Sequence, residues 1–231
     1  MPTPAHVLAE INRTDSAAPR ITCYDDVPGP TAGERIELSG RVIGTWVSKA
    51  ANALQEEWDL EPGSTVRLAM RPHWRLVYWA WAVWSVGACV DLDGTGPVDL
   101  VVTDDPEQLA SDGPGVLVTR ASLARRSPAP VPEGVMDEAA DLASYGDDFT
   151  PWAEPEDDDP ALRTAGGVGS YGQLVAGCGA AARVQLVDPT AEALLRTSLD
   201  VWSRGGSLVV HLGPTDVATL ERRARAEGVT A

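Results

Sequence analysis

The segment from Thr164 to Ser170 carries residue types that could bind a phosphate group. Its glycines Gly166, Gly167 and Gly169 allow backbone N–H groups to turn inward, and its Thr and Ser hydroxyls can donate further hydrogen bonds. Such a nest of N–H groups, placed ahead of a helix that begins near Ser170, would bind an anion. A tight strand-to-helix turn, in which the glycines only supply the backbone angles, explains the same residues, and we favour that turn.

Other catalytic patterns are weaker. Ser170 lies in Val-Gly-Ser-Tyr-Gly, which departs from the G-x-S-x-G nucleophile motif because Val168 replaces the first glycine. The three histidines are isolated and show no metal-binding spacing. The acidic run 154–159 lacks the alternating ligand spacing of an EF-hand calcium loop, so a solvated acidic loop is the better interpretation. We therefore predict no catalytic residue, no metal and no cofactor.

Composition limits the partners. The chain has 231 residues and a formal net charge of −16, which makes nucleic acid and anionic membranes poor partners. Its length suits a single α/β domain spanning 1–231. The longest uncharged run, 76–90, is shorter than the roughly 20 residues that a membrane-spanning helix needs. Together with the lack of a secretory signal pattern at the N-terminus, this predicts a cytoplasmic protein.

The spacing of the three cysteines also indicates a cytoplasmic protein. Cys23, Cys89 and Cys178 lie far apart, form no C-x-x-C motif and are odd in number. This pattern is typical of buried thiols in a reducing cytoplasm.

The order of predicted elements alternates strands and helices. Residues 20–24 and 34–38 alternate like the two strands of a hairpin. Apolar residues recur at helical spacing over 41–58, a strand follows at 65–69, and 73–86 is a helix that is apolar nearly all round. Downstream, the pattern predicts two strands and two helices, over 183–187, 191–203, 207–212 and 216–227.

Aromatic residues crowd the helix 73–86. Their spacings of three and four residues favour a place in the core over a ligand pocket or a partner surface. Trp79 and Trp81 cannot both point the same way as Trp84. We therefore expect at least one of them to reach the surface.

An acidic segment over 127–160 interrupts the alternation. It contains several prolines, and between Glu133 and Asp159 it has no Lys or Arg. Proline and like-charge repulsion both oppose regular pairing, so we expect an irregular excursion. Phe149, Pro151 and Trp152 would attach it to the domain.

Several motifs, taken in order, resemble the opening of the adenylate-forming enzymes, which include acyl- and aryl-CoA synthetases. They are E-R-I-E-L-S-G, L-E-P-G-S-T-V-R-L-A-M, V-D-L-V-V-T-D, and the lead-in from Asp159 to Gln173. The family's phosphate loop is longer, of the type T-S-G-[ST]-T-G-x-P-K-G. Only Thr164 to Val168 stands at that place, and no lysine follows Lys49. The nearest pattern is that of an uncharacterised, shortened actinobacterial family.

The resemblance implies a fold and a role. The fold would be a three-layer α/β domain with a largely parallel sheet and helices on both faces, like the first subdomain of acyl-adenylate ligases. The role would be non-catalytic, because the family's later catalytic segments would lie beyond Ala231 and the phosphate loop is degenerate. The chain would act by binding a partner or a small ligand.

Two alternatives remain open. A residual pocket at Thr164, Gly166, Gly167, Gly169 and Ser170 could hold an acyl or adenine nucleotide ligand, or the chain could be an enzyme whose site has no recognisable motif. The resemblance also implies an apolar face, which a second subdomain covers in the full-length family. We expect this face to be buried in a homodimer or against an unidentified protein partner, or to have been made polar by substitution.

Overall fold

The strands form two separate sheets. The computed structural model describes residues 2–109, 113–175 and 179–230. The small sheet has the order β10-β11-β1-β2 and the large sheet the order β7-β6-β5-β3-β4-β8-β9. The strands of the small sheet are β1 (Pro19–Asp25), β2 (Glu34–Ser39), β10 (Arg183–Val187) and β11 (Ser207–Leu212). Those of the large sheet are β3 (Thr65–Ala69), β4 (Cys89–Asp91), β5 (Leu100–Thr103), β6 (Gly115–Leu117), β7 (Val135–Asp137), β8 (Pro160–Thr164) and β9 (Gly167–Ser170).

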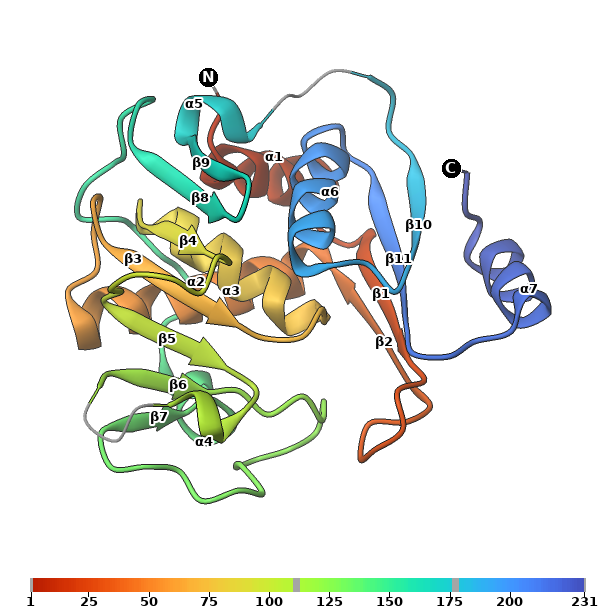
Figure 1. Ribbon diagram of the computed structural model, residues 1–231. Helices are drawn as coiled ribbons and strands as arrows, with labels where there is room; N and C mark the ends of the chain where they lie inside the picture. Colours follow the sequence, from red (N-terminus) through yellow and green to blue (C-terminus); the bar gives the residue numbers. More distant parts are fainter. Residues whose placement is uncertain (1, 110–112, 176–178, 231) are drawn as a thin grey trace.

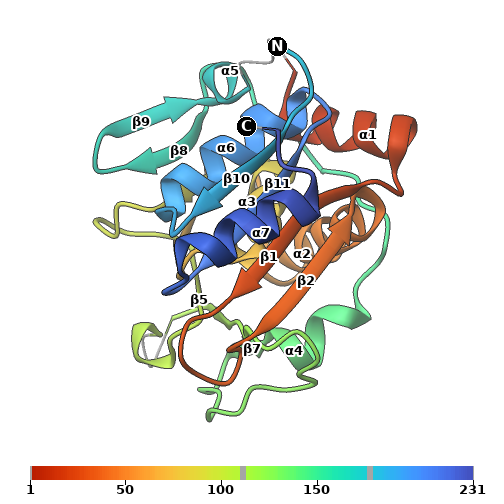
Figure 2. The ribbon, with the colours of Figure 1, turned by 90° about the vertical axis from the view of Figure 1, so that its right-hand side faces the viewer.

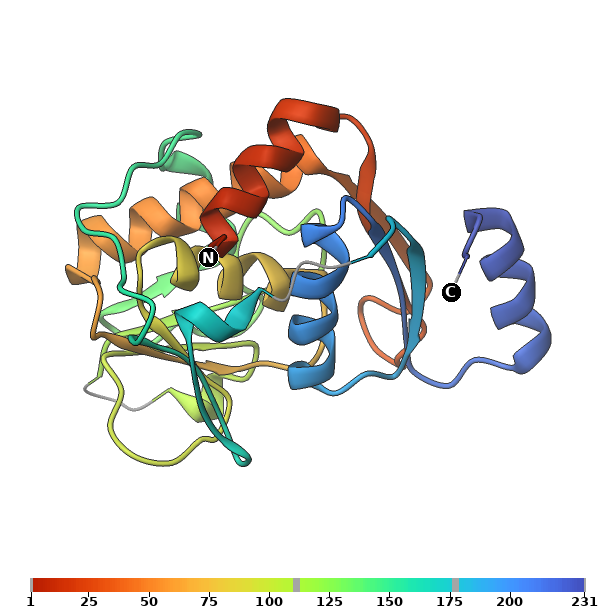
Figure 3. The same ribbon diagram turned by 90° about the horizontal axis from the view of Figure 1, so that it is seen from above.

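One helix packs against both sheets, and another covers the outer face of the small sheet. The helices are α1 (Pro4–Asp15), α2 (Gly40–Trp58), α3 (Trp74–Ser85), α4 (Glu138–Asp141), α5 (Tyr171–Leu174), α6 (Ala191–Ser203) and α7 (Val217–Glu227), with short 3₁₀ turns at Pro106–Gln108 and Leu142–Ser144. Helix α3 contacts β3 and β4 of the large sheet and β1 of the small sheet, while α6 packs on β10 and β11. Figures 1 and 3 show α7 alone beyond the small sheet, and Figure 2 shows it lying across the outer face of that sheet.

The predicted α/β class and the largely parallel pairing are confirmed. Only the pairs β1–β2 and β8–β9 are antiparallel among the described strands. The strands are divided between two sheets, where the sequence suggested one. A helix that is apolar all round, such as α3, has to be covered on every side, and the second sheet helps to supply that cover.

The predicted hairpin and the first long predicted helix are present at the expected residues. The hairpin over 20–24 and 34–38 is confirmed as β1 and β2, with Tyr24 opposite Arg35. Helix α2 begins after Ser39, whose hydroxyl accepts the N–H of Val42 at 3.4 Å. It ends at Trp58 and is capped by Asp59, which adopts a left-handed conformation with φ of 51°.

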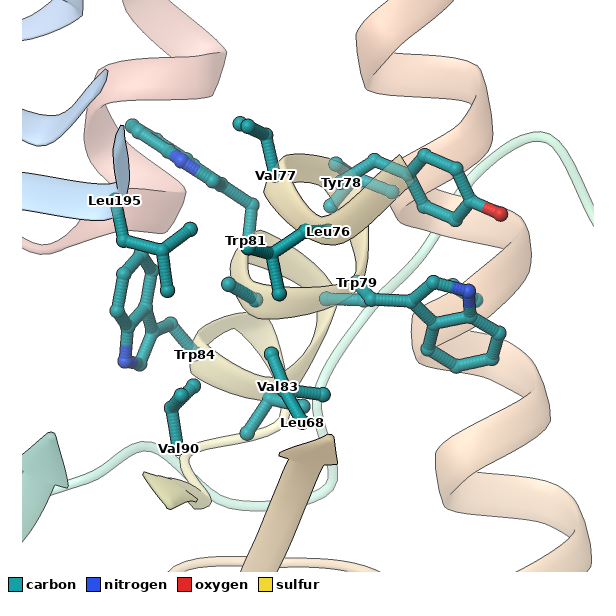
Figure 4. Packing of buried hydrophobic residues seen from close by; sticks show 14 of the residues in the cluster. Leu68, Leu76, Val77, Tyr78, Trp79, Trp81, Val83, Trp84, Val90 and Leu195 are labelled. Carbon is teal, nitrogen blue, oxygen red and sulfur yellow. The ribbon is translucent and has the colours of Figure 1, made fainter. Parts of the chain in front are cut away.

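The tryptophans of α3 all lie in the core. Trp79 and Trp81 are 0% exposed and Trp84 is 1% exposed, so the expectation that one of them reaches the surface is wrong. Figure 4 shows Trp79 and Tyr78 on one side of α3 and Trp84 on the other, where Leu195 of α6 lies. Helices on both flanks therefore bury opposite faces of α3. The core interpretation of this aromatic cluster is confirmed.

The acidic segment is more ordered than its charge suggested. Residues Val135–Asp137 form β7 on the edge of the large sheet, and α4 follows with Glu138 buried. Beyond them, residues 145–159 contain no helix or strand. Polar side chains of α2 hold the first part of this stretch: Asn52 Nδ2 donates to the carbonyls of Gly146 and Asp148 at 3.1 and 2.9 Å. Backbone carbonyls thus attach the segment, in addition to the partly buried Phe149, whereas Trp152 is 60% exposed.

Candidate functional site

The residues predicted to form a residual phosphate loop lie together in a β-hairpin. Thr164 ends β8 and pairs with Gly167, which begins β9. Ser170 ends β9 and is the N-cap of α5. The structure therefore differs from the expected strand-to-helix turn, because Gly167 and Gly169 belong to a short strand that precedes the helix. Gly167, with φ of 123°, is where the tight connection requires a glycine.

The polar groups of this hairpin bond to one another. The hydroxyl of Thr164 accepts the N–H of Gly166 at 3.2 Å. The N–H of Ser170 donates to Oε1 of Gln173 at 3.3 Å. The ladder between β8 and β9 pairs Leu162 with Gly169. An anion nest needs several N–H groups that converge on one empty point, and these contacts direct the groups elsewhere.

A cavity of about 270 Å³ separates the hairpin from α6. Glu192 and Arg196 of α6 lie on the opposite wall. The Nε of Arg196 donates to Oε1 of Glu192 at 2.8 Å. Arg196 is a cation that the sequence analysis did not connect with the hairpin. No local pattern signals it, because α6 reaches the hairpin only through the tertiary fold. Its charge is offset by Glu192, so the cavity suits a small polar group better than a triphosphate.

A large hollow lies at the carboxyl ends of the parallel strands. We call it the central crevice; its volume is about 740 Å³, and Met70, Arg71, Leu92, Asp104 and Ala191 are among its lining residues. The strand order places β4 on one side of β3 and β5 on the other. Ligands of open α/β sheets bind at such a switch point, outside the carboxyl ends of the strands.

An ion pair between Arg71 and Asp104 lies in the wall of the central crevice. Arg71 follows β3 and Asp104 follows β5, and Arg71 Nε lies 3.0 Å from Asp104 Oδ2. Asp104 is almost fully buried, with 3% of its side chain exposed, while Arg71 is 62% exposed. The buried carboxylate also accepts the backbone N–H of Arg71 at 3.3 Å. The guanidinium group is thus held at the rim, and its two Nη groups form no hydrogen bond with any residue that the structure describes.

Among the described residues, the thiols and the metal-ligand types do not form a reactive centre. Cys23 and Cys89 are buried, and burial raises the pKa of the Cys23 thiol to about 12. That thiol is protonated at neutral pH and unreactive. Cys178 lies outside the described residues. Within residues 2–109, 113–175 and 179–230, no group of three or more His, Cys, Asp or Glu side chains is placed to hold a metal ion.

His73 is a further titratable group at the start of α3. It is 2% exposed, and its Nδ1 accepts the N–H of Arg75 at 3.4 Å. Burial, together with the positive charges of Arg75, Arg120 and Arg71, holds the pKa of His73 well below its usual value. The ring is neutral at physiological pH and caps the helix, so it is a structural residue.

Comparisons with known proteins agree on the fold. No protein-family model matches the chain. A "TIGR03089 family protein" of Mycobacterium tuberculosis is 29% identical over 97% of this chain and 95% of its own length. The structure of an acyl-CoA synthetase of Brucella canis has a TM-score of 0.72 at 15% identity, covering 99% of this chain. The N-terminal subdomain of NpsA from Klebsiella oxytoca gives 0.64 at 15% identity, covering 98% of this chain.

The lengths of these structures differ from that of this chain. The chain spans 46% of the Brucella enzyme and 58% of the NpsA chain. A fatty acyl CoA synthetase of Mycobacterium tuberculosis, with a TM-score of 0.67 at 14% identity, is spanned to 48%. None of the helices among the described residues is long and apolar enough to cross a membrane. The chain therefore has the fold of the N-terminal subdomain of adenylate-forming enzymes and is a homologue of the mycobacterial TIGR03089 family protein.

Proposed function

We propose that this protein binds a small ligand or a partner chain at the carboxyl ends of its large sheet and does not form acyl adenylates. The proposal rests on the hydrogen bonding within the β8–β9 hairpin. The hydroxyl of Thr164 and the N–H groups of Gly166 and Ser170 are engaged within the hairpin and α5. A triphosphate needs several converging N–H groups and cations to offset its charge.

The surroundings of the hairpin supply little positive charge. Arg196 is the cation on the cavity wall, and it is paired with Glu192. Lys49, the only lysine of the chain, is engaged elsewhere, since its Nζ lies 2.7 Å from Asp147 Oδ1 and donates to two backbone carbonyls. These features support a binding role over nucleotide activation.

The central crevice is the favoured binding place. It has a volume of about 740 Å³, it lies at the switch point of the sheet, and it presents an arginine whose position is fixed by a buried carboxylate. A ligand with a polar or anionic group could bind Arg71 and place an apolar part against Met70 and Leu92.

A second candidate is a residual pocket for an acyl or adenine nucleotide ligand beside the hairpin. The observation in its favour is Arg196, which faces the cavity opposite Gly166 and Ser170. In this arrangement the ligand would place one anionic group between the hairpin and α6, without the triphosphate geometry of the adenylation reaction.

A thermal-shift screen with ATP, AMP, CoA and acyl-CoAs tests the binding role, because a ligand that binds only the native state raises the Tm. We expect at least one of these ligands to raise it. Arg71→Met and Arg196→Met are matched variants, since each removes an exposed arginine paired with one carboxylate. Loss of the shift in Arg71→Met alone assigns the ligand to the carboxyl ends of the large sheet, where Arg71 lies, and loss in Arg196→Met alone assigns it to the hairpin. No shift with any compound would contradict the small-ligand form of the proposal.

A further inference from the structure

A smaller cavity lies beside the central crevice and shares Arg71 and Asp104 with it. We call it the side cavity. Its volume is about 210 Å³, and its walls are the β1–β2 loop at 28–31, the end of β6 with residues 117–121, and residues 127–129. It therefore lies where the carboxyl ends of strands from both sheets come together.

The walls of the side cavity are largely apolar. Four prolines line it, at positions 28, 30, 106 and 128, together with Leu117, which is 2% exposed. Proline side chains are rigid, so the shape of the cavity changes little on binding. A volume of this size accepts a short apolar body and excludes a long chain.

A buried network fixes one arginine at this cavity. Arg120 Nη2 donates to Asp25 Oδ2 at 3.2 Å and to the hydroxyl of Thr31 at 3.1 Å. That hydroxyl in turn donates to Asp25 Oδ2 at 2.7 Å. Arg120 is 10% exposed and Asp25 is 2% exposed, measured on their side chains. The guanidinium group is thus oriented before any ligand arrives, as is Arg71 by Asp104.

Thr119 adds an unused hydrogen-bonding group to the wall. The residue is 7% exposed and lines the side cavity. Its backbone N–H donates to Glu138 Oε2 at 3.4 Å, but its hydroxyl has no hydrogen-bond partner among the described residues. A buried hydroxyl without a partner is destabilising, and a group in the cavity that bonds to it would relieve this cost.

The charge of the surrounding loop is opposite to that of the whole chain. The segment after β6 carries Arg120, Arg125 and Arg126 in a protein of net charge −16. Arg125 and Arg126 are exposed and form no ion pair with any residue that the structure describes. Positive groups around a concave site with low-dielectric walls raise the local concentration of anions.

We propose that the side cavity is a binding site for a small organic oxyanion, a compound with one carboxylate or phosphate group on a short apolar body. The oxyanion would bind Arg71 and Arg120 at the mouth, with the hydroxyl of Thr119 as a further donor after a small local adjustment. The apolar body would lie among the prolines. Asp25 and Asp104 balance the two arginines, so the site favours a single anionic group over a polyphosphate. This inference gives a ligand class and a place to a protein with the binding role proposed above.

Isothermal titration calorimetry on the full chain tests the site with three probes of similar shape: butyrate, butyl phosphate and the neutral butyramide. We expect butyrate or butyl phosphate to bind at least about tenfold more tightly than butyramide, because a hydrogen bond to a charged group is worth about 1.5–3 kcal/mol. The comparison of the first two probes identifies which oxyanion the site prefers.

Three variants locate the binding. Arg71→Met removes one cation and should weaken oxyanion binding about tenfold. Ala129→Leu fills the side cavity while leaving the central crevice open, and should abolish binding. Arg13→Met removes an exposed arginine of α1 that pairs with Glu10, far from both cavities in the sequence, and should leave binding unchanged. A thermal melt of each variant confirms that it is folded.

The inference is overturned if neither oxyanion binds, if butyramide binds as tightly as they do, or if Ala129→Leu and Arg71→Met bind like the unmodified chain. Its failure is distinguishable from failure of the proposed function. A nucleotide or CoA shift without oxyanion binding would remove the site and leave the binding role. Pyrophosphate release would contradict the proposed function without affecting the site.

Discussion

Glu138 and Arg75 form a buried ion pair at the point where α3, α4 and the segment after β6 meet. Arg75 Nη1 lies 2.5 Å from Glu138 Oε1, and the two side chains are 5% and 1% exposed. The hydroxyl of Tyr78 also donates to this carboxylate, and Arg75 Nη2 donates to the carbonyl of Ala121 at 3.2 Å. Burial raises the pKa of Glu138, while Arg75 and Tyr78 favour the charged form. The pair therefore fixes the segment that carries Thr119 and Arg120.

Removing one partner of this pair should be costly. Glu138→Ala leaves the guanidinium group of Arg75 buried without a counter-charge, and we expect a loss of about 3–5 kcal/mol in the free energy of unfolding. Urea unfolding followed by circular dichroism measures it. Glu10→Ala, at an exposed pair with Arg13, is the control and should leave the midpoint unchanged. A Glu138→Ala protein as stable as the unmodified chain would show that the pair contributes nothing.

Single residues also show how far the site could be predicted from sequence. Thr164 to Ser170 could be found because they are contiguous and glycine-rich. Arg71 and Asp104 are 33 residues apart and meet only because β3 and β5 are neighbours. Arg120 binds Asp25 across a separation of 95 residues. Nothing local in the sequence signals such pairs, so both cavities became visible only in the structure.

At the scale of elements, α7 is held to the small sheet by polar contacts. None of its residues is buried. Its last residue, Glu227, accepts hydrogen bonds from Tyr24, Arg35 and Arg183 at 2.5, 2.8 and 2.6 Å. Burial by itself would raise the pKa of Glu227, but these hydrogen bonds outweigh it and hold the pKa below the ordinary value.

Acid should therefore loosen α7 first. Because the pKa of Glu227 is lower in the folded chain, its stabilising contribution is present above the ordinary value of 4.5 and is lost as the pH falls through the folded pKa. We expect amide protection factors in α7 to fall on acidification before those of α2 and α3. Glu227→Gln should reproduce the loss at neutral pH, and the exposed Glu221→Gln should not. Equal protection of α7 in Glu227→Gln and the unmodified chain would contradict this role.

Lys49 anchors the acidic segment to α2. Its Nζ donates to the carbonyls of Ala143 and Tyr145 at 3.0 and 2.5 Å. Lys49→Met removes these bonds and should cost about 1–3 kcal/mol, with faster amide exchange confined to residues 143–152. Arg41→Met, on the same helix but with one long contact to Ser16 of 3.4 Å, is the control. Unchanged exchange over 143–152 would show that the segment is held by other contacts.

Elements with strong periodicity could be predicted, and those that depend on distant partners could not. Helices α2 and α3 follow from their apolar spacing. The division into two sheets depends on β1 pairing with β11 across the length of the chain. Strand β7 is three residues long and lies in acidic sequence, so its pairing with β6 is invisible without the fold. The burial of Trp79 depends on the packing of α2 against α3.

At the scale of the whole molecule, the homodimer predicted from the sequence remains a proposal. Large apolar side chains are exposed on several separate elements, namely at Val42, Leu123, Trp152, Val168, Val187 and Val217. A net charge of −16 repels a second copy. We expect dimerisation to strengthen as added salt screens this repulsion. Light scattering over a salt series measures it, and a monomer at every protein and salt concentration would rule the homodimer out.

The central claim is that this adenylate-former fold binds without activating a carboxylic acid, and pyrophosphate release is its most direct test. The full chain is incubated with ATP, magnesium and a panel of aliphatic and aromatic acids, beside an active acyl-CoA synthetase as positive control. In the hairpin from Thr164 to Ser170, the N–H groups of Gly166 and Ser170 donate to side chains of the hairpin and α5. We therefore predict pyrophosphate at the background level with every acid. Acid-dependent pyrophosphate release above background, lost when Arg196 is changed to Met, would contradict the account and place ATP chemistry at the hairpin.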